Sequence, residues 1–148
     1  MIKKLLYFIF IILFIGCSNT DKTGNDVFSV DYSKGLEQFN KSSYVSSDSF
    51  DASSVDANFQ NAYLWVSIKY DKLSSSINSN NTQEPEYLLY SEVEGKGLDY
   101  TFSIPNANQK FIEGSLTFSE DASSLTIKFT KNVLYPTLVG KTFVCNKK

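Results

Sequence analysis

The fold is decided by residues 97–130, which read GLDYTFSIPNANQKFIEGSLTFSEDASSLTIKFT. Apolar and polar residues alternate along most of this stretch, and two short polar interruptions divide it into three runs. Alternation is the pattern of a β-strand with one buried and one wet face, because successive side chains point to opposite faces of the sheet. The sequence therefore predicts half-buried antiparallel strands over residues 98–104, 112–118 and 125–130.

Turn-forming residues lie between these runs. The sequences Pro-Asn-Ala-Asn at 105–108 and Ser-Glu-Asp-Ala-Ser at 119–123 are typical of tight connections. Upstream, Gly-Lys-Gly at 95–97 predicts a hairpin with a less regular strand over residues 87–93. Because short connections place successive strands side by side, we expect an all-β fold, an antiparallel meander that forms a barrel or a sandwich. Gly114, inside a strand, is expected to mark a bend or bulge that lets the sheet curl.

The flanking regions are interpreted with the same rules. Further strands are expected over residues 63–70 and 142–145. Residues 27–32 also alternate and are predicted as a strand, and residues 33–40 as a short helix N-capped by its first residue. Residues 42–58 are predicted as a loop with one edge strand. Residues 74–86 form a low-complexity polar stretch, which predicts a long loop.

The composition excludes several kinds of function. The chain of 148 residues has no histidine, and all 14 of its basic residues are lysine. Without histidine it cannot build a Ser-His-Asp or Cys-His nucleophile or an imidazole metal site. Without arginine it lacks the bidentate group that clamps phosphate and contacts guanine. Since the formal net charge is −2 as well, we expect no nucleic-acid partner, no cofactor and no metal, and a protein that is not an enzyme.

The N-terminus has the order of an export signal. Lys3 and Lys4 precede an uncharged apolar run of 11 residues, Leu5 to Ile15, and Gly16-Cys17-Ser18 follows directly. A transmembrane helix needs about 20 apolar residues, so this run is too short to span a bilayer. A short basic start, an apolar run and a small residue at its end are the features of a signal peptide.

The residues around Cys17 resemble the lipobox of bacterial lipoproteins. Ile15 and Gly16 stand at the aliphatic and small positions ahead of the acceptor cysteine, and Phe14 stands where leucine is commonest. The resemblance implies cleavage between Gly16 and Cys17 and attachment of acyl chains such as palmitate, through a diacylglyceryl group, to the Cys17 sulfur. Two or three acyl chains hold a protein stably on a membrane. An ordinary secretory signal and a retained membrane anchor are the alternatives.

These features divide the chain into three parts. Residues 1–16 are the predicted signal peptide, residues 17–26 the lipidated cysteine with a flexible polar tether, and residues 27–148 a single β-domain. Ser18 stands where lipoproteins retained in the inner membrane of enteric bacteria have aspartate. The resemblance therefore implies a bacterial cell-envelope protein that is lipid-anchored in the outer membrane or at the cell surface.

Few side chains are placed for chemistry. Cys145 lies in an apolar terminal strand and is expected to be a small buried side chain rather than a reactive thiol. Acidic pairs occur only in polar sequence near turns, where a solvated role is expected, so a carboxylate-based hydrolase is the least favoured function. These pairs are Glu84 with Glu86, Glu92 with Glu94, and Glu120 with Asp121. The aspartates of the 42–58 loop lack the spacing of a calcium-binding loop.

Aromatic residues in predicted strands are the remaining candidates for ligand contacts, with core packing as the alternative. They are Tyr63, Trp65, Tyr100 and Phe102. The hairpins of residues 97–145 resemble small lipocalin-like lipoproteins of bacteria, although no glycine precedes Trp65 as in the lipocalin Gly-x-Trp opening. Two functions follow besides the hydrolase. One is surface binding of an envelope or host protein, and the other is carriage of a small apolar ligand, which needs an enclosed cavity of at least ~300 Å³.

Overall fold

The computed structural model describes residues 28–87, 89–106 and 109–148. The predicted signal peptide, the lipobox and the tether lie outside these residues. The described chain forms strands and two 3₁₀ helices, which confirms the predicted all-β class. The strands are β1 (Ser42–Ser46), β2 (Tyr63–Lys69), β3 (Lys72–Asn78), β4 (Glu92–Lys96), β5 (Asp99–Asn106), β6 (Gln109–Phe118), β7 (Ser124–Asn132) and β8 (Thr142–Lys147). The helices are η1 (Leu36–Phe39) and η2 (Pro136–Leu138).

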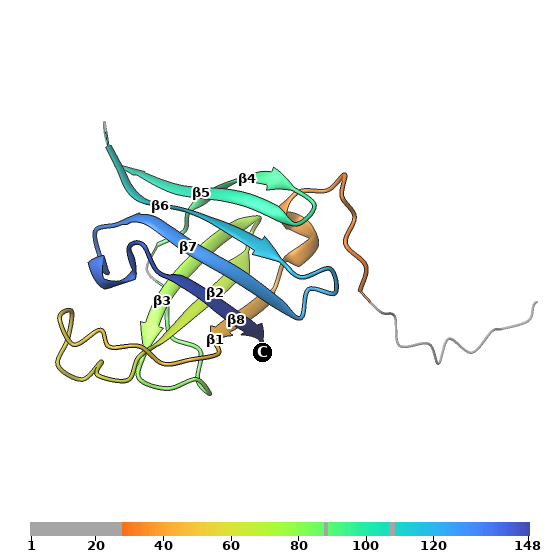
Figure 1. Ribbon diagram of the computed structural model, residues 1–148. Coiled ribbons are helices and arrows are strands. Elements are labelled where there is room, and N and C mark those ends of the chain that lie inside the picture. Colours follow the sequence, from red (N-terminus) through yellow and green to blue (C-terminus); the bar gives the residue numbers. More distant parts are fainter. Residues whose placement is uncertain (1–27, 88, 107–108) are drawn as a thin grey trace, which may run out of the picture.

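All eight strands belong to one antiparallel sheet with the order β3-β2-β1-β8-β7-β6-β5-β4. Apart from β3 and β4, strands that follow each other in the chain are paired, and the first strand pairs with the last. The sheet curls on itself, as Figure 1 shows, and its two edges meet at one isolated bridge between Leu73 and Ser91. The predicted meander is therefore a barrel-like sheet. Among the residues that the structure describes, no helix has the length and hydrophobicity needed to cross a bilayer.

Aromatic and aliphatic side chains fill the inside of the curled sheet. Phe39 from η1 stacks on Phe118 of β6 with ring centroids 3.7 Å apart. Phe102 of β5 meets the ring of Phe129 of β7 edge-on at 5.5 Å. Tyr44 of β1 is fully buried and donates its hydroxyl proton to a backbone carbonyl of the β6–β7 turn at 3.1 Å. Each large side chain buried in this way contributes about 1.5–3 kcal/mol relative to an exposed one, so the strands are held together from within.

Gly114 marks a bulge, as predicted. The register between β6 and β7 shifts between Glu113 and Gly114. A Cβ atom at position 114 would lie 2.3 Å from the Lys128 carbonyl oxygen and 2.4 Å from the Phe102 ring. Only glycine allows the β6 backbone to approach its neighbours this closely, and the bulge bends the strand so that the sheet can curl.

The first described residues depart from the prediction. Residues 28–32 do not form a strand but run across one end of the barrel towards η1. The predicted helix is a single 3₁₀ turn that begins after Gly35. Ser33 does not cap it, because the Ser33 backbone and hydroxyl both donate to the Asp31 carboxylate instead. The two apolar residues of η1 are buried, as the spacing indicates, and they close this end of the barrel.

Two strands lie where loops are predicted. β1 occupies the start of the 42–58 region and is a central strand between β2 and β8, not an edge strand. β3 occupies the start of the 74–86 region, and its serine-rich sequence forms a strand because every one of its residues has a partner in β2. β4 begins at Glu92, so the strand predicted over residues 87–93 overlaps it only at its end. In each case pairing with neighbours overrides a weak local pattern.

Candidate functional site

The aromatic residues predicted to contact a ligand do not converge on one place. Tyr100 and Phe102 are buried on the inner face of β5, where they contact other core aromatics. Tyr63 and Trp65 alternate with the core residues of β2, so they lie on its outer face. Alternation in the sequence shows which residues share a face, but it does not tell which face turns inward.

The interior leaves little room for a ligand. A cavity of about 20 Å³ lies at the seam between β3 and β4, and Ser75, Ser91, Ile104 and Tyr135 are among its lining residues. That is room for one water molecule, whereas ligand pockets occupy about 300–1,000 Å³. Larger hollows lie on the outside, such as an open groove of about 480 Å³ across β4, β5 and β6. In the part of the chain that the structure describes, the barrel interior is therefore packed and the grooves lie on the outer surface.

The segment that follows β3, residues 79–87, covers the outer face of β2. Trp65 is only 1% exposed, and its indole N–H donates to a backbone carbonyl of this segment at 3.0 Å. Glu84 accepts a hydrogen bond from the Ser43 hydroxyl at 2.8 Å and lies 3.9 Å from the Lys69 ammonium group. These contacts bury β2 on both faces. The sequence predicts a long polar loop at this place but not that the loop packs against the sheet.

Tyr87 completes this cover. The Lys69 ammonium lies 5.7 Å from the centre of the Tyr87 ring. Burial and the neighbouring Glu84 carboxylate raise the pKa of the Tyr87 hydroxyl well above its usual range, so it stays a neutral group under the cover. The covering segment thus combines an aromatic ring with an ion pair, and its role in the described structure is to shield β2.

A second segment packs against the barrel at one of its ends, which we call the N-terminal end. This end is formed by residues 28–41, the β2–β3, β4–β5 and β6–β7 turns, and the last residues of β8. The other end, where the β1–β2 and β7–β8 loops lie, we call the far end (Figure 1). The N-terminal segment crosses its end as a plug, and Phe39 inserts from it into the core.

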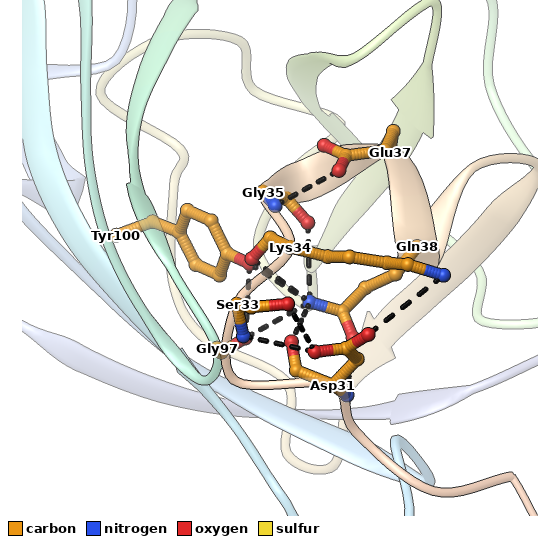
Figure 2. A network of polar contacts seen from close by, with 8 residues as sticks. All are labelled: Asp31, Ser33, Lys34, Gly35, Glu37, Gln38, Gly97 and Tyr100. Carbon is orange, nitrogen blue, oxygen red and sulfur yellow. Dashed lines mark hydrogen bonds and ion pairs between the residues drawn. The ribbon is translucent and has the colours of Figure 1, made fainter.

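Gln38 holds this plug together, as Figure 2 shows. Its side-chain oxygen accepts the Asp31 N–H at 2.9 Å, and its amide nitrogen lies 3.1 Å from the Gly35 carbonyl oxygen and 3.4 Å from the Tyr100 hydroxyl. The Tyr100 hydroxyl donates to the Gly97 carbonyl at 2.9 Å. The network therefore joins the N-terminal segment to the β4–β5 hairpin, and Tyr100, a predicted ligand contact, is a structural residue within it.

The charged side chains of the plug interact with neighbouring residues of the same segment. Hydrogen bonds from the Ser33 hydroxyl and backbone lower the pKa of the Asp31 carboxyl, and Lys34 lies 3.9 Å from it. Burial raises the pKa of Tyr100, so its hydroxyl remains a proton donor at neutral pH. The carboxylate is exposed, so solvent screens its ion pair with Lys34 and the pair adds little to stability.

Two tyrosines project from the N-terminal end. Tyr70 is 84% exposed and Tyr32 is 63% exposed. Tyr70 and Asp71 form the β2–β3 turn with φ angles of 54° and 58°, a conformation that costs a non-glycine residue roughly 1–2 kcal/mol. The Asn40 side chain holds the turn, because its oxygen accepts the Asp71 N–H at 3.0 Å and its amide donates to the Asp71 carboxylate. The sequence gives no sign of this turn beyond the break in alternation.

The predicted acidic pairs, which all lie in the described residues, are exposed to solvent. Glu92 and Glu94 are exposed on the outer face of β4, beside Glu113, which pairs with Lys110 at 3.2 Å. In the residues described here, no three acidic or cysteine side chains gather closely enough to hold a metal ion. Asp51, in the predicted loop of aspartates, accepts the Ser53 N–H and so stabilises its own turn.

Cys145 is buried in β8, as predicted. Its side chain is fully enclosed in the core, and burial raises the pKa of the thiol to about 12. Since the thiolate is the reactive form, this cysteine is inert at neutral pH.

Comparison with protein-family models, with characterised proteins and with solved structures gives no match for this chain.

Proposed function

We propose that this protein is a lipid-anchored bacterial envelope protein whose β-domain binds partners on its outer surface and does not catalyse a reaction. The observation that carries the proposal is Ile15-Gly16-Cys17 directly after an uncharged apolar run of 11 residues. Cleavage before Cys17 and acylation of its sulfur would leave the domain attached to the membrane through residues 18–26. The proposed location is the outer membrane or the cell surface, and the membrane is the first partner.

Surface binding is favoured over carriage of an apolar ligand. The seam cavity of about 20 Å³ is too small for any ligand larger than water. Of the aromatic candidates, Tyr100 and Phe102 fill the core and Trp65 lies under the covering segment. An envelope or host protein would therefore meet the grooved outside of the barrel. The hydrolase is the weakest alternative, because exposed carboxylates such as Glu92 and Glu94 lack the buried setting that acid–base catalysis needs.

Acyl labelling of the full-length protein in a bacterial host tests the anchor. We expect labelled palmitate to enter the wild-type protein and the Cys145→Ala variant, and to be lost in Cys17→Ala. Detergent phase partitioning should follow the label, because two or three acyl chains hold a protein stably in a lipid phase. Equal labelling of Cys17→Ala and wild type would refute the anchor. Cys145→Ala is the matched control, since it removes the other cysteine of the chain.

Mass spectrometry of the protein extracted from its native membrane tests the carrier alternative. We expect the polypeptide to carry its covalent acyl chains and no apolar small molecule in stoichiometric amount. A single apolar compound that co-purifies at equal molarity would favour the carrier, and the seam between β3 and β4 would then be the place to look for its entry.

A further inference from the structure

The described chain begins at the N-terminal end of the barrel. Phe28 lies there against Phe39 of η1, with ring centroids 5.7 Å apart, and the Lys147 ammonium lies 5.9 Å from the Phe28 ring. Ten residues, 18–27, separate Phe28 from Cys17. Fully extended, they reach at most about 36 Å. A flexible coil of ten residues spans roughly 16–19 Å on average. That is about half of the roughly 33 Å that the 10 residues of β6 span, so the end of the barrel at which Phe28 lies is the end held nearer the lipid.

We propose that the N-terminal end of the barrel rests on the bilayer that holds the acyl chains, with Tyr32 and Tyr70 in the interfacial region. The proposal depends on the lipid anchor at Cys17 proposed above. Its occupant is the membrane surface because the chain outside the described structure is short and ends at this face. The anchor thus supplies more than attachment, since it sets which end of the domain meets the lipid.

The side chains at this end suit a membrane interface. Tyrosine has an apolar ring and a polar tip, and it is enriched where membranes meet water. Tyr70 projects from the β2–β3 turn, and Tyr32 lies against Gly97 in the β4–β5 turn. In the order of the sheet, the ends of β1 and β8 and the β6–β7 turn lie between these turns, and they bring exposed Lys41 and Lys148 together with exposed Glu120 and Asp121. The two tyrosine rings, rather than a net charge, are therefore the groups at this end that suit a membrane interface.

The turn that holds Tyr70 is a second, independent indication. Two-residue hairpin turns with positive φ normally have Asn-Gly or Asp-Gly, whereas this one has Tyr70-Asp71. Tyr70 is 84% exposed, so core packing does not account for the choice of a large aromatic residue there. Strained residues cluster at functional sites, where the strain is part of the function. Contact with lipid would account for an exposed aromatic ring at this position of the turn.

Tryptophan fluorescence in lipid vesicles tests the orientation. The full mature lipoprotein is reconstituted into vesicles of phosphatidylethanolamine and phosphatidylglycerol that contain lipids brominated near the headgroup. Three variants report on position: Tyr32→Trp and Tyr70→Trp at the N-terminal end, and Val133→Trp, which is 51% exposed at the far end. Trp65 is buried and present in all of them, so the parent protein supplies the background.

We expect bromine to quench the added fluorescence at positions 32 and 70 about twofold more than at position 133, since interfacial rings sit roughly 5–10 Å into the headgroup boundary. Equal quenching at all three positions, or none, in protein that still sediments with vesicles would overturn the orientation and leave the anchor standing. Protein that fails to sediment would overturn both. Stronger quenching at position 133 than at the other two would show the reverse orientation.

Lysine acetylation on the same vesicles adds a readout that does not depend on tryptophan. We expect Lys41 and Lys148 to lose reactivity in vesicles relative to detergent, and Lys141 at the far end to keep it. In the double variant Tyr32→Ser with Tyr70→Ser, Lys41 should regain its reactivity. The acyl chains should still hold this variant protein in the vesicle fraction. If Lys41 is protected equally in the double variant and in the parent protein, the two tyrosines do not contribute to the contact with the membrane.

Discussion

β2 and β7 both have aliphatic or aromatic core residues at every second position, but only β7 has a wet face. In β7, Leu125, Ile127 and Phe129 are buried and the residues between them are exposed. In β2, the five central residues are all buried. The difference comes from outside the strand, because the segment after β3 lies across the outer face of β2 while the outer face of β7 meets solvent. Alternation in a strand indicates which residues share its buried face. Whether the other face is also buried depends on whether a segment from another part of the chain covers it.

The largest expected effect tests whether that second layer is part of the folded core. Trp65→Ala removes a fully buried indole and its hydrogen bond to the covering segment, and we expect a loss of about 3–5 kcal/mol in the free energy of unfolding. Thr126→Ala, at the equivalent exposed position of β7, should stay within about 0.5 kcal/mol of wild type. Urea denaturation of both variants measures the contrast. A loss below about 1 kcal/mol for Trp65→Ala would mean that the cover detaches readily and that β2 resembles β7 after all.

The same contrast explains which strands can be predicted from the sequence. β5, β6 and β7 are predicted closely because each has one wet face, which leaves polar residues at every second position. β1 has the buried pair Tyr44 and Val45 side by side, and β3 has three successive serines, so neither alternates. Both form because neighbouring backbones pair with them, and the pairing of β1 with β8 is a contact across the length of the domain. Local pattern does not report such contacts.

The candidate site divides in a similar way. The proposed lipobox is recognised by the order of neighbouring residues, so Cys17 and Gly16 can be proposed from the sequence alone. The four aromatic candidates depend on which face of a strand turns inward, and the structure separates them into Tyr100 and Phe102 inside and Tyr63 and Trp65 outside. The display of Tyr70 depends on its φ angle and on Asn40, which lies 31 residues before its hydrogen-bond partner Asp71. Only a folded chain brings those together.

The second prediction concerns the bulge that bends β6 against β7. Gly114→Ala places a methyl group where backbone and ring atoms already lie within 2.4 Å, and the backbone of Lys128 cannot move aside as a flexible side chain can. We expect a loss of about 1–3 kcal/mol in stability. Ser115→Ala, the next residue and exposed, is the matched control and should be nearly neutral. Thermal unfolding followed by circular dichroism measures both. Equal melting temperatures would show that the two strands can separate at the bulge without cost.

The third prediction uses the buried thiol beside β7. Burial raises the Cys145 pKa from 9.0 to about 12 in the folded protein. A group whose folded pKa is raised stabilises the fold fully below its unfolded pKa and loses that contribution as the pH rises towards the folded pKa. Stability should therefore fall between pH 9 and pH 12, by about 1 kcal/mol at pH 10. Tyr44, whose pKa burial raises to about 12, should add to the decline above pH 10.

Urea denaturation across this pH range measures the slope, and Cys145→Ala is the control. That variant is expected to be less stable at every pH, because the core loses a sulfur atom, but to decline less between pH 9 and pH 10. A parallel decline in both proteins would assign the alkaline loss to other groups. Maleimide labelling of the native protein at pH 8 should be slow and should become fast in denaturant, since only the unfolded chain exposes the thiol.

The smallest expected effect lies at the turn after β2, and it runs in the opposite direction. Tyr70→Asn replaces an exposed residue at positive φ with one that tolerates this conformation, so the fold should gain about 1 kcal/mol. Tyr32→Asn removes an exposed tyrosine whose φ is not positive and should leave stability unchanged. If the ring of Tyr70 contacts lipid, the more stable Tyr70→Asn protein should also lose the vesicle protection of Lys41. A variant that gains stability and keeps that protection would leave the displayed tyrosine without a role at the membrane. One that gains stability and loses the protection would show that β2 gives up stability at its turn to hold an aromatic ring against the bilayer.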